Sequence, residues 1–102
     1  MNDTATGAGE TIRVTLKVFG GLREALGTPE RSIRLSRAAS LDTLLERLRI
    51  DEPAFAQRLD EGLAKGYLNI LRNGRNVRFL DGLETQLSEG DVIACLPPVG
   101  GG

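Results

Sequence analysis

Apolar and polar residues alternate strictly near the start of the chain. In residues 12–18 every second side chain is apolar, and arginine, threonine and lysine occupy the positions between them. This period of two predicts a half-buried strand. The alternation returns in residues 31–37, after the stretch "FGGLREALGTPE" that glycine and proline punctuate. We therefore expect two antiparallel strands joined by a connection of moderate length.

The period of the apolar positions becomes helical after Ser40. Leu41, Leu44, Leu45 and Leu48 fall at i, i+3, i+4 and i+7, which places them on one face of a helix. Ser40 stands where a side-chain oxygen caps the first helical turn. A second, weaker helical stretch is predicted from the next proline onward, in residues 53–66.

The second half of the chain predicts a hairpin and a last strand. Two apolar runs flank the pair Asn73-Gly74, a sequence typical of a two-residue hairpin turn. Residues 81–91 predict a turn that contains one helical turn. Residues 91–97, "DVIACLP", are apolar on both faces, which is expected of a strand in a central position.

This order of elements predicts an α+β domain of the ubiquitin-like β-grasp kind, with one main helix packed on one face of a mixed sheet. The first and last strands would lie side by side and parallel in the middle, because the long connection between them allows that crossover. We expect residues 1–10 to form a mobile leader, residues 11–98 the domain and residues 99–102 an extended tail.

Composition supports one small domain and argues against several classes of partner. The chain has 102 residues, of which 40% are hydrophobic and 26% charged, with 13 Lys and Arg against 14 Asp and Glu. A net charge of −1 does not favour nucleic acid or an anionic membrane as the main partner. No stretch has the roughly 20 apolar residues of a membrane span, and no signal-peptide pattern is present. These features predict a soluble cytoplasmic protein.

The residue types available leave little catalytic chemistry. The chain has no histidine, which is the commonest general base and metal ligand, and its single cysteine, Cys95, excludes an intramolecular disulfide. No phosphate-binding loop, zinc-ligand spacing or nucleophile elbow occurs. We expect a protein that binds no metal and is not itself an enzyme.

The chain ends in "LPPVGGG", and this segment has a chemical interpretation. Pro97 and Pro98 cannot donate to a sheet ladder, so the strand should end there and the next residues should point away from the domain. Four residues at about 3.3 Å each reach on the order of 13 Å, enough to enter a pocket of another protein. Glycines pass through a narrow channel, which would bring the carboxylate of Gly102 to a catalytic centre. Because a carboxylate is a poor electrophile, an ATP-dependent partner would have to activate it, and we expect an acyl-adenylate.

Two motifs carry a resemblance to a known family. The stretch "LSEGDVIACLPPVGGG" contributes Leu87, Gly90, Asp91, Val92, Pro97, Pro98, Val99, Gly101 and Gly102, and "VFGGLREALG" contributes Phe19, Leu22, Arg23, Glu24 and Gly27. Over residues 12–102 the chain resembles the small subunit of molybdopterin synthase and its relatives. These are ubiquitin-like sulfur carriers that include the thiamine-pathway carrier and archaeal small modifier proteins.

The resemblance implies a mechanism in which the catalytic side chains belong to partners. A ubiquitin-activating-like adenylyltransferase would use ATP and magnesium to adenylate Gly102, and a persulfide donor would supply the sulfur of a thiocarboxylate. In the molybdopterin branch the large subunit of the synthase receives the tail, here Pro98, Val99, Gly100 and Gly101. This chain would bind no cofactor itself. Its segments 51–67 and 79–87 are longer than the barest carriers need, which favours a molybdopterin-type or modifier-type protein over the thiamine branch.

Three functional hypotheses remain at this point. The chain is a sulfur carrier, a ubiquitin-like modifier joined through Gly102 to lysines of other proteins, or a non-covalent interaction module that ends in glycine. The first two share the same activation step, so they do not exclude each other.

Several residues are candidates for contact with a partner. Phe19 and Leu22 either pack internally or contact a partner, and Leu71 and Ile93 would form a hydrophobic docking patch if they lie on the face that the helix leaves open. Basic residues on the strands and hairpin either meet an acidic groove or are simply solvated; they are Arg13, Lys17, Arg34, Arg72, Arg75 and Arg78. Cys95 is either a persulfide relay or a small core residue, and the second interpretation is favoured for a cysteine in an apolar strand.

Overall fold

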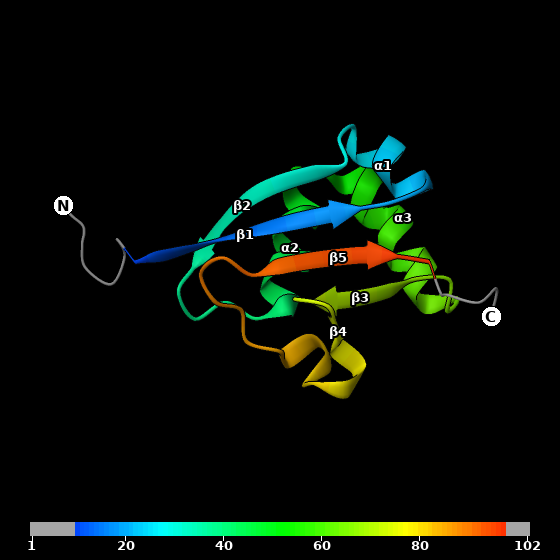
Figure 1. Cartoon of the computed structure of the whole chain (residues 1–102). Coiled ribbons are helices and arrows are strands. Elements are labelled where there is room, and N and C mark those ends of the chain that lie inside the picture. Colours follow the sequence, from blue (N-terminus) through cyan, green and yellow to red (C-terminus); the bar gives the residue numbers. More distant parts are fainter. Residues whose placement is uncertain (1–9, 98–102) are drawn as a thin grey trace.

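The computed structural model describes residues 10–97, whose strands form one mixed sheet (Figure 1). The strands are β1 (Thr11–Val18), β2 (Glu30–Ser36), β3 (Asn69–Arg72), β4 (Arg75–Asn76) and β5 (Val92–Leu96), in the spatial order β2-β1-β5-β3-β4. β1 and β5 are parallel, whereas β1 and β2, β3 and β5, and β3 and β4 are antiparallel. The first and last strands therefore lie side by side inside the sheet, as predicted.

Helices cover one face of this sheet, behind it in Figure 1. They are α2 (Leu41–Asp51) and α3 (Pro53–Ala64), with the short α1 (Gly21–Leu26) at one end of the sheet. The arrangement confirms the predicted α+β, ubiquitin-like β-grasp class. The helical layer differs in detail, because α3, with 12 residues, is as substantial as α2, with 11.

The core lies between the sheet and these helices. The predicted leucine stripe of α2 is buried, and Phe55 and Leu59 of α3 extend it. Facing them are the inward residues of β1, together with Ile93 and Cys95 of β5. A fully buried leucine or phenylalanine contributes on the order of 1.5–3 kcal/mol, so this layer provides most of the stability of the domain.

The predicted cap of α2 is present. Ser40 Oγ accepts a hydrogen bond from the Thr43 backbone N–H, and the Ser40 backbone N–H donates to Thr43 Oγ1. This reciprocal pair satisfies two backbone donors that the first helical turn leaves without partners. Ser40 thus begins α2 where the sequence places it.

One helix was not predicted. The stretch expected to be a connection of moderate length contains α1, which ends at Gly27 in the left-handed conformation, with a φ of 87°. Leu22 and Leu26, spaced by four, are both buried and hold α1 against the domain. Six residues bounded by glycines give too short a helical period to recognise from sequence, so packing decides this element.

The hairpin prediction is confirmed at its turn, with a shorter second strand than expected. Asn73 and Gly74 both have positive φ, 51° and 87°, as a two-residue hairpin turn of this kind requires. β4 has only two residues, after which the chain turns into 3₁₀ helices at Val77–Phe79 and Gly82–Glu84. The latter is the helical turn expected within residues 81–91.

No helix within residues 10–97 is long and apolar enough to cross a membrane. Residues 1–9 of the predicted leader and the whole predicted tail, residues 99–102, lie outside the described residues. The boundaries assigned to those two segments stay predictions.

Candidate functional site

The end of β5 determines where the carboxyl-terminal segment begins. β5 ends at Leu96, and the exposed Pro97 follows it, so the strand stops where proline was predicted to stop it. In Figure 1 this point lies at the end of the sheet beside the start of α1. The site residues predicted beyond it, Gly102 as the reacting group and Pro98, Val99, Gly100 and Gly101 as the inserted tail, lie outside the described residues.

β5 has apolar residues on both faces, but only one of these faces is buried. Ile93 and Cys95 point into the core, whereas Val92, Ala94 and Leu96 are half-buried on the side away from the helices. Leu71 of β3 pairs with Ala94 and has the same half-buried character. The strand therefore displays apolar side chains on an open face of the sheet, where polar side chains are the usual choice.

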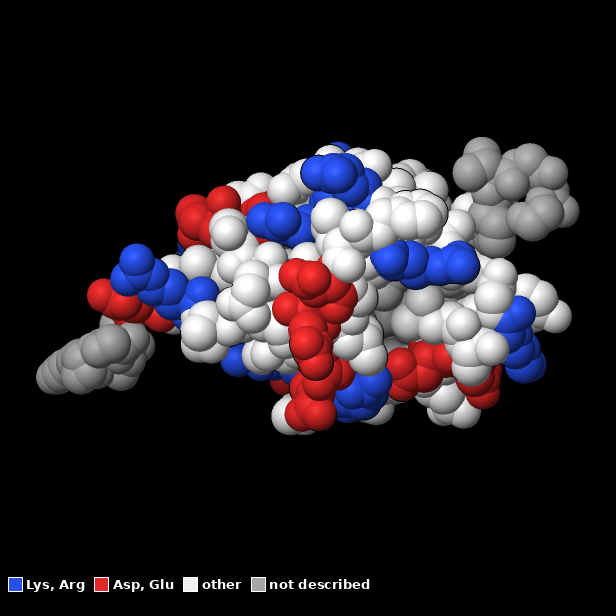
Figure 2. All heavy atoms as spheres, turned by 90° about the horizontal axis from the view of Figure 1, so that it is seen from below, with Lys and Arg blue, Asp and Glu red and all other residues white. Residues whose placement is uncertain are grey.

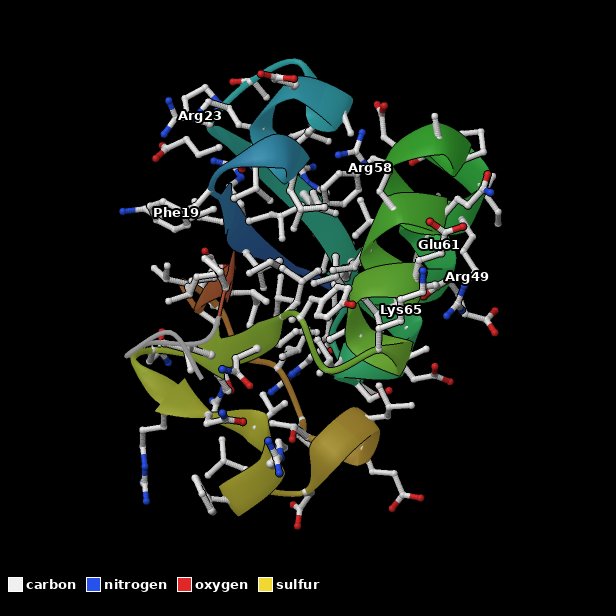
Figure 3. All side chains as sticks on the ribbon, turned by 90° about the vertical axis from the view of Figure 1, so that its right-hand side faces the viewer. Phe19, Arg23, Arg49, Arg58, Glu61 and Lys65 are labelled. Atoms are coloured by element: carbon white, nitrogen blue, oxygen red, sulfur yellow. The ribbon has the colours of Figure 1, made fainter. Side chains whose placement is uncertain are left out.

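Phe19 extends this apolar surface toward the base of the tail. Its side chain is 42% exposed and projects on the side away from α3 (Figure 3). We call Phe19, Leu71, Val92, Ala94 and Leu96 the open-face patch. Lys17, which pairs with Ala94, is an exposed cation beside it. Exposed and half-exposed apolar side chains gathered on one face are typical of a protein-docking surface.

Two residues predicted to contact a partner are instead part of the core. Ile93 has no exposed surface and pairs with Leu16 of β1 on the helix-covered face, so its assignment to a docking patch is wrong. Leu22 is 5% exposed and holds α1 to the domain, so it packs internally rather than contacting a partner. The alternation along β5 assigns Ile93 and Leu96 to opposite faces, but sequence alone does not say which face the helices cover.

Arg72 belongs to a hydrogen-bonded network around Asp91. The carboxylate of Asp91, 4% exposed, accepts from Arg72 Nε at 2.7 Å, from Asn73 Nδ2 at 2.9 Å and from the Ser88 backbone N–H at 2.8 Å. Burial by itself would raise the pKa of Asp91, but these hydrogen bonds and the charge of Arg72 outweigh it and lower the pKa. Arg72 therefore has a structural role, and its contact with a partner stays a prediction.

The network also explains the Gly90-Asp91 pair of the resemblance motif. Gly90 has a φ of 85°, a left-handed conformation that residues with a Cβ rarely adopt. The turn at Gly90 brings Asp91 back under the hairpin, where Asn73 Oδ1 also accepts from the Val92 backbone N–H at 2.8 Å. Hairpin and last strand are thereby joined by side chains as well as by the β3–β5 ladder.

The basic residues do not form one continuous face. Arg13, Lys17 and Arg34 are exposed, and Arg13 pairs with Arg34 across β1 and β2, whereas Arg72 is on the other face, in register with Ile93. On the face shown in Figure 2, a column of Asp and Glu side chains lies among Lys and Arg. Recognition by charge is therefore local rather than a property of one whole face.

Cys95 is a core residue. It is 1% exposed, and burial raises the pKa of its thiol to about 12. A thiol that stays protonated and inaccessible is a poor nucleophile, so the structure favours the core interpretation over a persulfide relay. Within residues 10–97 there is also no group of three or more His, Cys, Asp or Glu side chains placed to hold a metal ion.

With this geometry established, comparison with known proteins identifies the family. The model of the ThiS family matches residues 16–102, which include β5 and the glycine-rich end. The chain belongs to the ThiS family. Its resemblance to ubiquitin-like sulfur carriers, inferred above from two motifs, is thereby confirmed.

This ThiS-family protein is similar to small archaeal modifier proteins in both sequence and fold. It is 35% identical to small archaeal modifier protein 3 of Haloferax volcanii over 92 residues, 89% of this chain and 100% of the relative. Its fold is similar to that of small archaeal modifier protein 1 of Methanosarcina acetivorans, with a TM-score of 0.72 and 39% identity over 92% of this chain and all of the other.

A second similar structure is the proposed subunit 1 of the molybdopterin converting factor of Pyrococcus furiosus. The TM-score is 0.65 and the identity 27%, over 86% of this chain and 99% of the other. The chain is thus homologous to both the modifier and the molybdopterin branches of the ubiquitin-like sulfur carriers, and small carriers of this kind are not themselves catalysts.

Proposed function

We propose that this protein carries sulfur as a thiocarboxylate on Gly102. The observation that carries the proposal is the family match, which extends through Gly102. In the chain, this terminus comes shortly after β5, a strand inside the sheet. An adenylyltransferase partner uses ATP and magnesium to form the acyl-adenylate and releases pyrophosphate. The outer sulfur of a persulfide donor then attacks the acyl-adenylate and displaces AMP, which gives an acyl disulfide with the donor. A thiol cleaves the S–S bond of this disulfide, forms a new disulfide with the donor and releases the thiocarboxylate, which delivers its sulfur to an acceptor.

The open-face patch supports the need for partners. A carrier whose described residues offer no reactive thiol and no group of His, Cys, Asp or Glu placed to hold a metal would bring its terminus to the active site of another protein. The half-buried residues Leu71, Val92 and Leu96 offer that protein an apolar surface next to the base of the tail. We propose that the activating enzyme docks there, and that a synthase large subunit does so in turn.

Two destinations for the activated terminus are equally supported. Similarity to the molybdopterin converting factor subunit favours delivery of sulfur to a pterin precursor, as the small subunit of a molybdopterin synthase. Similarity to modifier proteins 1 and 3 favours conjugation of Gly102 to lysines of other proteins. Both destinations use the same acyl-adenylate.

Intact-protein mass spectrometry of the chain purified from its own cells tests the carrier function. Replacement of one carboxylate oxygen by sulfur raises the mass of the terminus, and loading should require the activating enzyme, a sulfur donor and ATP. A variant without Gly101 and Gly102 should fold but take up no sulfur, whereas one without Asp3 and Thr4 should load normally. A terminus that stays a carboxylate under these conditions contradicts the proposal.

Conjugation to lysines is distinguished from sulfur delivery by the peptide that trypsin leaves on each modified lysine. The last Lys or Arg of the chain is Arg78, so trypsin leaves residues 79–102 on a modified lysine rather than a short diglycine. A search for that 24-residue branch tests the modifier function directly. Finding it supports conjugation, and its absence in cells that carry the thiocarboxylate favours sulfur delivery alone.

A further inference from the structure

A small hollow at the base of the tail contains one charged side chain. Its volume is about 210 Å³, and its lining includes Phe19, Gly21, Arg58, Tyr67 and Pro97. Figure 3 shows this end of the molecule, with Arg58 between α1 and α3 and Phe19 on the side of the open face. Three elements far apart in sequence, the start of α1, the middle of α3 and the end of β5, therefore meet where the chain continues into its last five residues.

Arg58 lies against Gly21. A Cβ at Gly21 would lie 2.8 Å from Arg58 Nη2, too close for two unbonded atoms, so a larger residue there would make the flexible end of the arginine side chain move. Gly21 has no positive φ, which means that its backbone conformation does not require glycine. Alanine at this position is therefore compatible with the backbone but would shift the guanidinium.

A second glycine shapes the same hollow from the other side. Gly62 lies inside α3, where glycine costs about 1 kcal/mol relative to alanine. A Cβ there would lie 2.3 Å from Leu68 Cδ1, and Leu68 is a wall of the hollow. The low helix propensity of glycine is therefore offset by the close packing of Leu68 against α3.

The chemistry of the hollow fits a carboxylate. Arg58 is its only charged lining residue, and among the ion pairs within residues 10–97 none includes Arg58. A guanidinium binds a carboxylate through two parallel hydrogen bonds and suits interfaces because it is weakly hydrated. Tyr67, 65% exposed, lines the hollow beside Arg58, whereas the Phe19 side chain projects from its rim toward the open face. Apolar contacts that exclude water around a charged pair increase the contribution of that pair to binding.

We propose that Arg58 receives an Asp or Glu side chain of the activating enzyme and so orients the base of the tail on that enzyme. Arg58 acts as a positioning residue, because it lies on the domain and not at the reacting terminus. This inference rests on the proposed function. It adds that the partner presents a carboxylate beside the apolar surface that covers Phe19.

The test measures ATP–pyrophosphate exchange by the purified adenylyltransferase of the same organism, with this chain as substrate. Arg58→Gln should raise the KM for the chain on the order of tenfold, with kcat unchanged, because a lost docking contact affects binding and not chemistry. Arg58→Lys keeps the charge but not the paired hydrogen bonds and should have an intermediate KM. Arg23→Gln is the matched control, since Arg23 is exposed at the same end but does not line the hollow.

Gly21→Ala tests the geometry independently. The added Cβ displaces the end of the Arg58 side chain and should raise the KM in the wild-type background but not in the Arg58→Gln background. Unchanged KM in Arg58→Gln, or an equal rise in Arg23→Gln, overturns the inference while the proposed function stands. If the wild-type chain supports no exchange at all, the proposed function and this inference both fail.

Discussion

Asp91 joins the hairpin to the last strand through a single carboxylate. Its hydrogen bonds reach Arg72, Asn73 and Ser88, and the Asp91 carboxylate itself is almost fully buried. A buried acceptor with several donors is costly to alter, because each donor left without a partner loses its hydrogen bonds to both protein and water. The Gly-Asp pair of the sequence motif is therefore explained by folding rather than by contact with a partner.

We expect Asp91→Asn to lower the free energy of unfolding by about 2–3 kcal/mol, since it removes the charge opposite Arg72 and replaces an acceptor by a donor. Urea denaturation at neutral pH measures this. Asp51→Asn, at an exposed position at the end of α2, should change stability by less than about 0.5 kcal/mol. Equal losses in the two variants would contradict the role of Asp91.

The same carboxylate predicts a pH dependence. Its pKa in the folded protein is below the ordinary value of 3.8, so its contribution is fully present above that value and is lost as the pH falls through the folded pKa. The stability difference between wild type and Asp91→Asn should be constant above about pH 5 and shrink toward lower pH. Denaturation curves from pH 7 to pH 2 check this, and a difference that grows on acidification would reverse the sign of the argument.

Cys95 is predicted to be chemically silent in the folded protein. Because the thiol is buried and its pKa is about 12, it should react with an aromatic disulfide reagent at pH 8 only after denaturation. Cys95→Ala should lose about 1–2 kcal/mol of stability but still load sulfur at Gly102. Loss of loading in a folded Cys95→Ala protein would restore the persulfide-relay interpretation.

At the scale of elements, α3 shows how tertiary packing overrides helix propensity. Gly62 lies within this helix, and its missing side chain admits Leu68 from the segment that leads into β3. The sequence correctly predicts the helix from its proline start, but the glycine appears only as a weakness in the pattern. The reason for the glycine is Leu68, which comes six residues later in the chain and packs against the helix at this position.

Gly62→Ala should therefore destabilise the protein by about 1–2 kcal/mol, although the same change in an open helix is stabilising. In a Leu68→Ala background the clash disappears, and Gly62→Ala should then stabilise by up to about 1 kcal/mol. Thermal unfolding followed by circular dichroism measures all four proteins of this cycle. A stabilising effect in both backgrounds would show that Gly62 is not required for packing.

At the scale of the whole molecule, the two faces of the sheet have different roles, because one face stabilises the fold and the other is available to a partner. One face holds the core with α2 and α3, and the other holds the open-face patch next to the base of the tail. β5 contributes to both faces through alternate residues, which is why it is apolar throughout. A partner can cover the open face without disturbing the core.

Leu71→Asp tests this separation. Because Leu71 is half-buried, the substitution should cost about 1 kcal/mol of stability, yet it should raise the KM of ATP–pyrophosphate exchange about tenfold or more. Ile50→Asp is the matched control, since Ile50 is 77% exposed on α2, on the helical side of the domain. A similar rise in both variants would mean that the partner does not dock on the open face.

The sequence by itself determined those parts of the protein that depend on local periodicity and turn chemistry. Alternation predicted β1 and β2, the leucine spacing and Ser40 predicted α2, and Asn73-Gly74 predicted the hairpin, because each signal acts within a few residues. The glycine-rich end and its motif indicated the family for the same reason. The six-residue α1 escaped prediction, since so short a helix depends on the burial of Leu22 and Leu26 against the domain.

Only the tertiary structure decided which side of each element meets the core. β5 is apolar at every position, so its sequence allows either Ile93 or Leu96 to be buried, and the covering helices select Ile93. From sequence, Arg72 is one of several basic residues that could meet a partner and Arg58 has no assigned role, until the fold brings Asp91 to one and Gly21 to the other. The physical reason is that burial and ion pairing arise between elements distant in sequence, and no local pattern records which elements will meet.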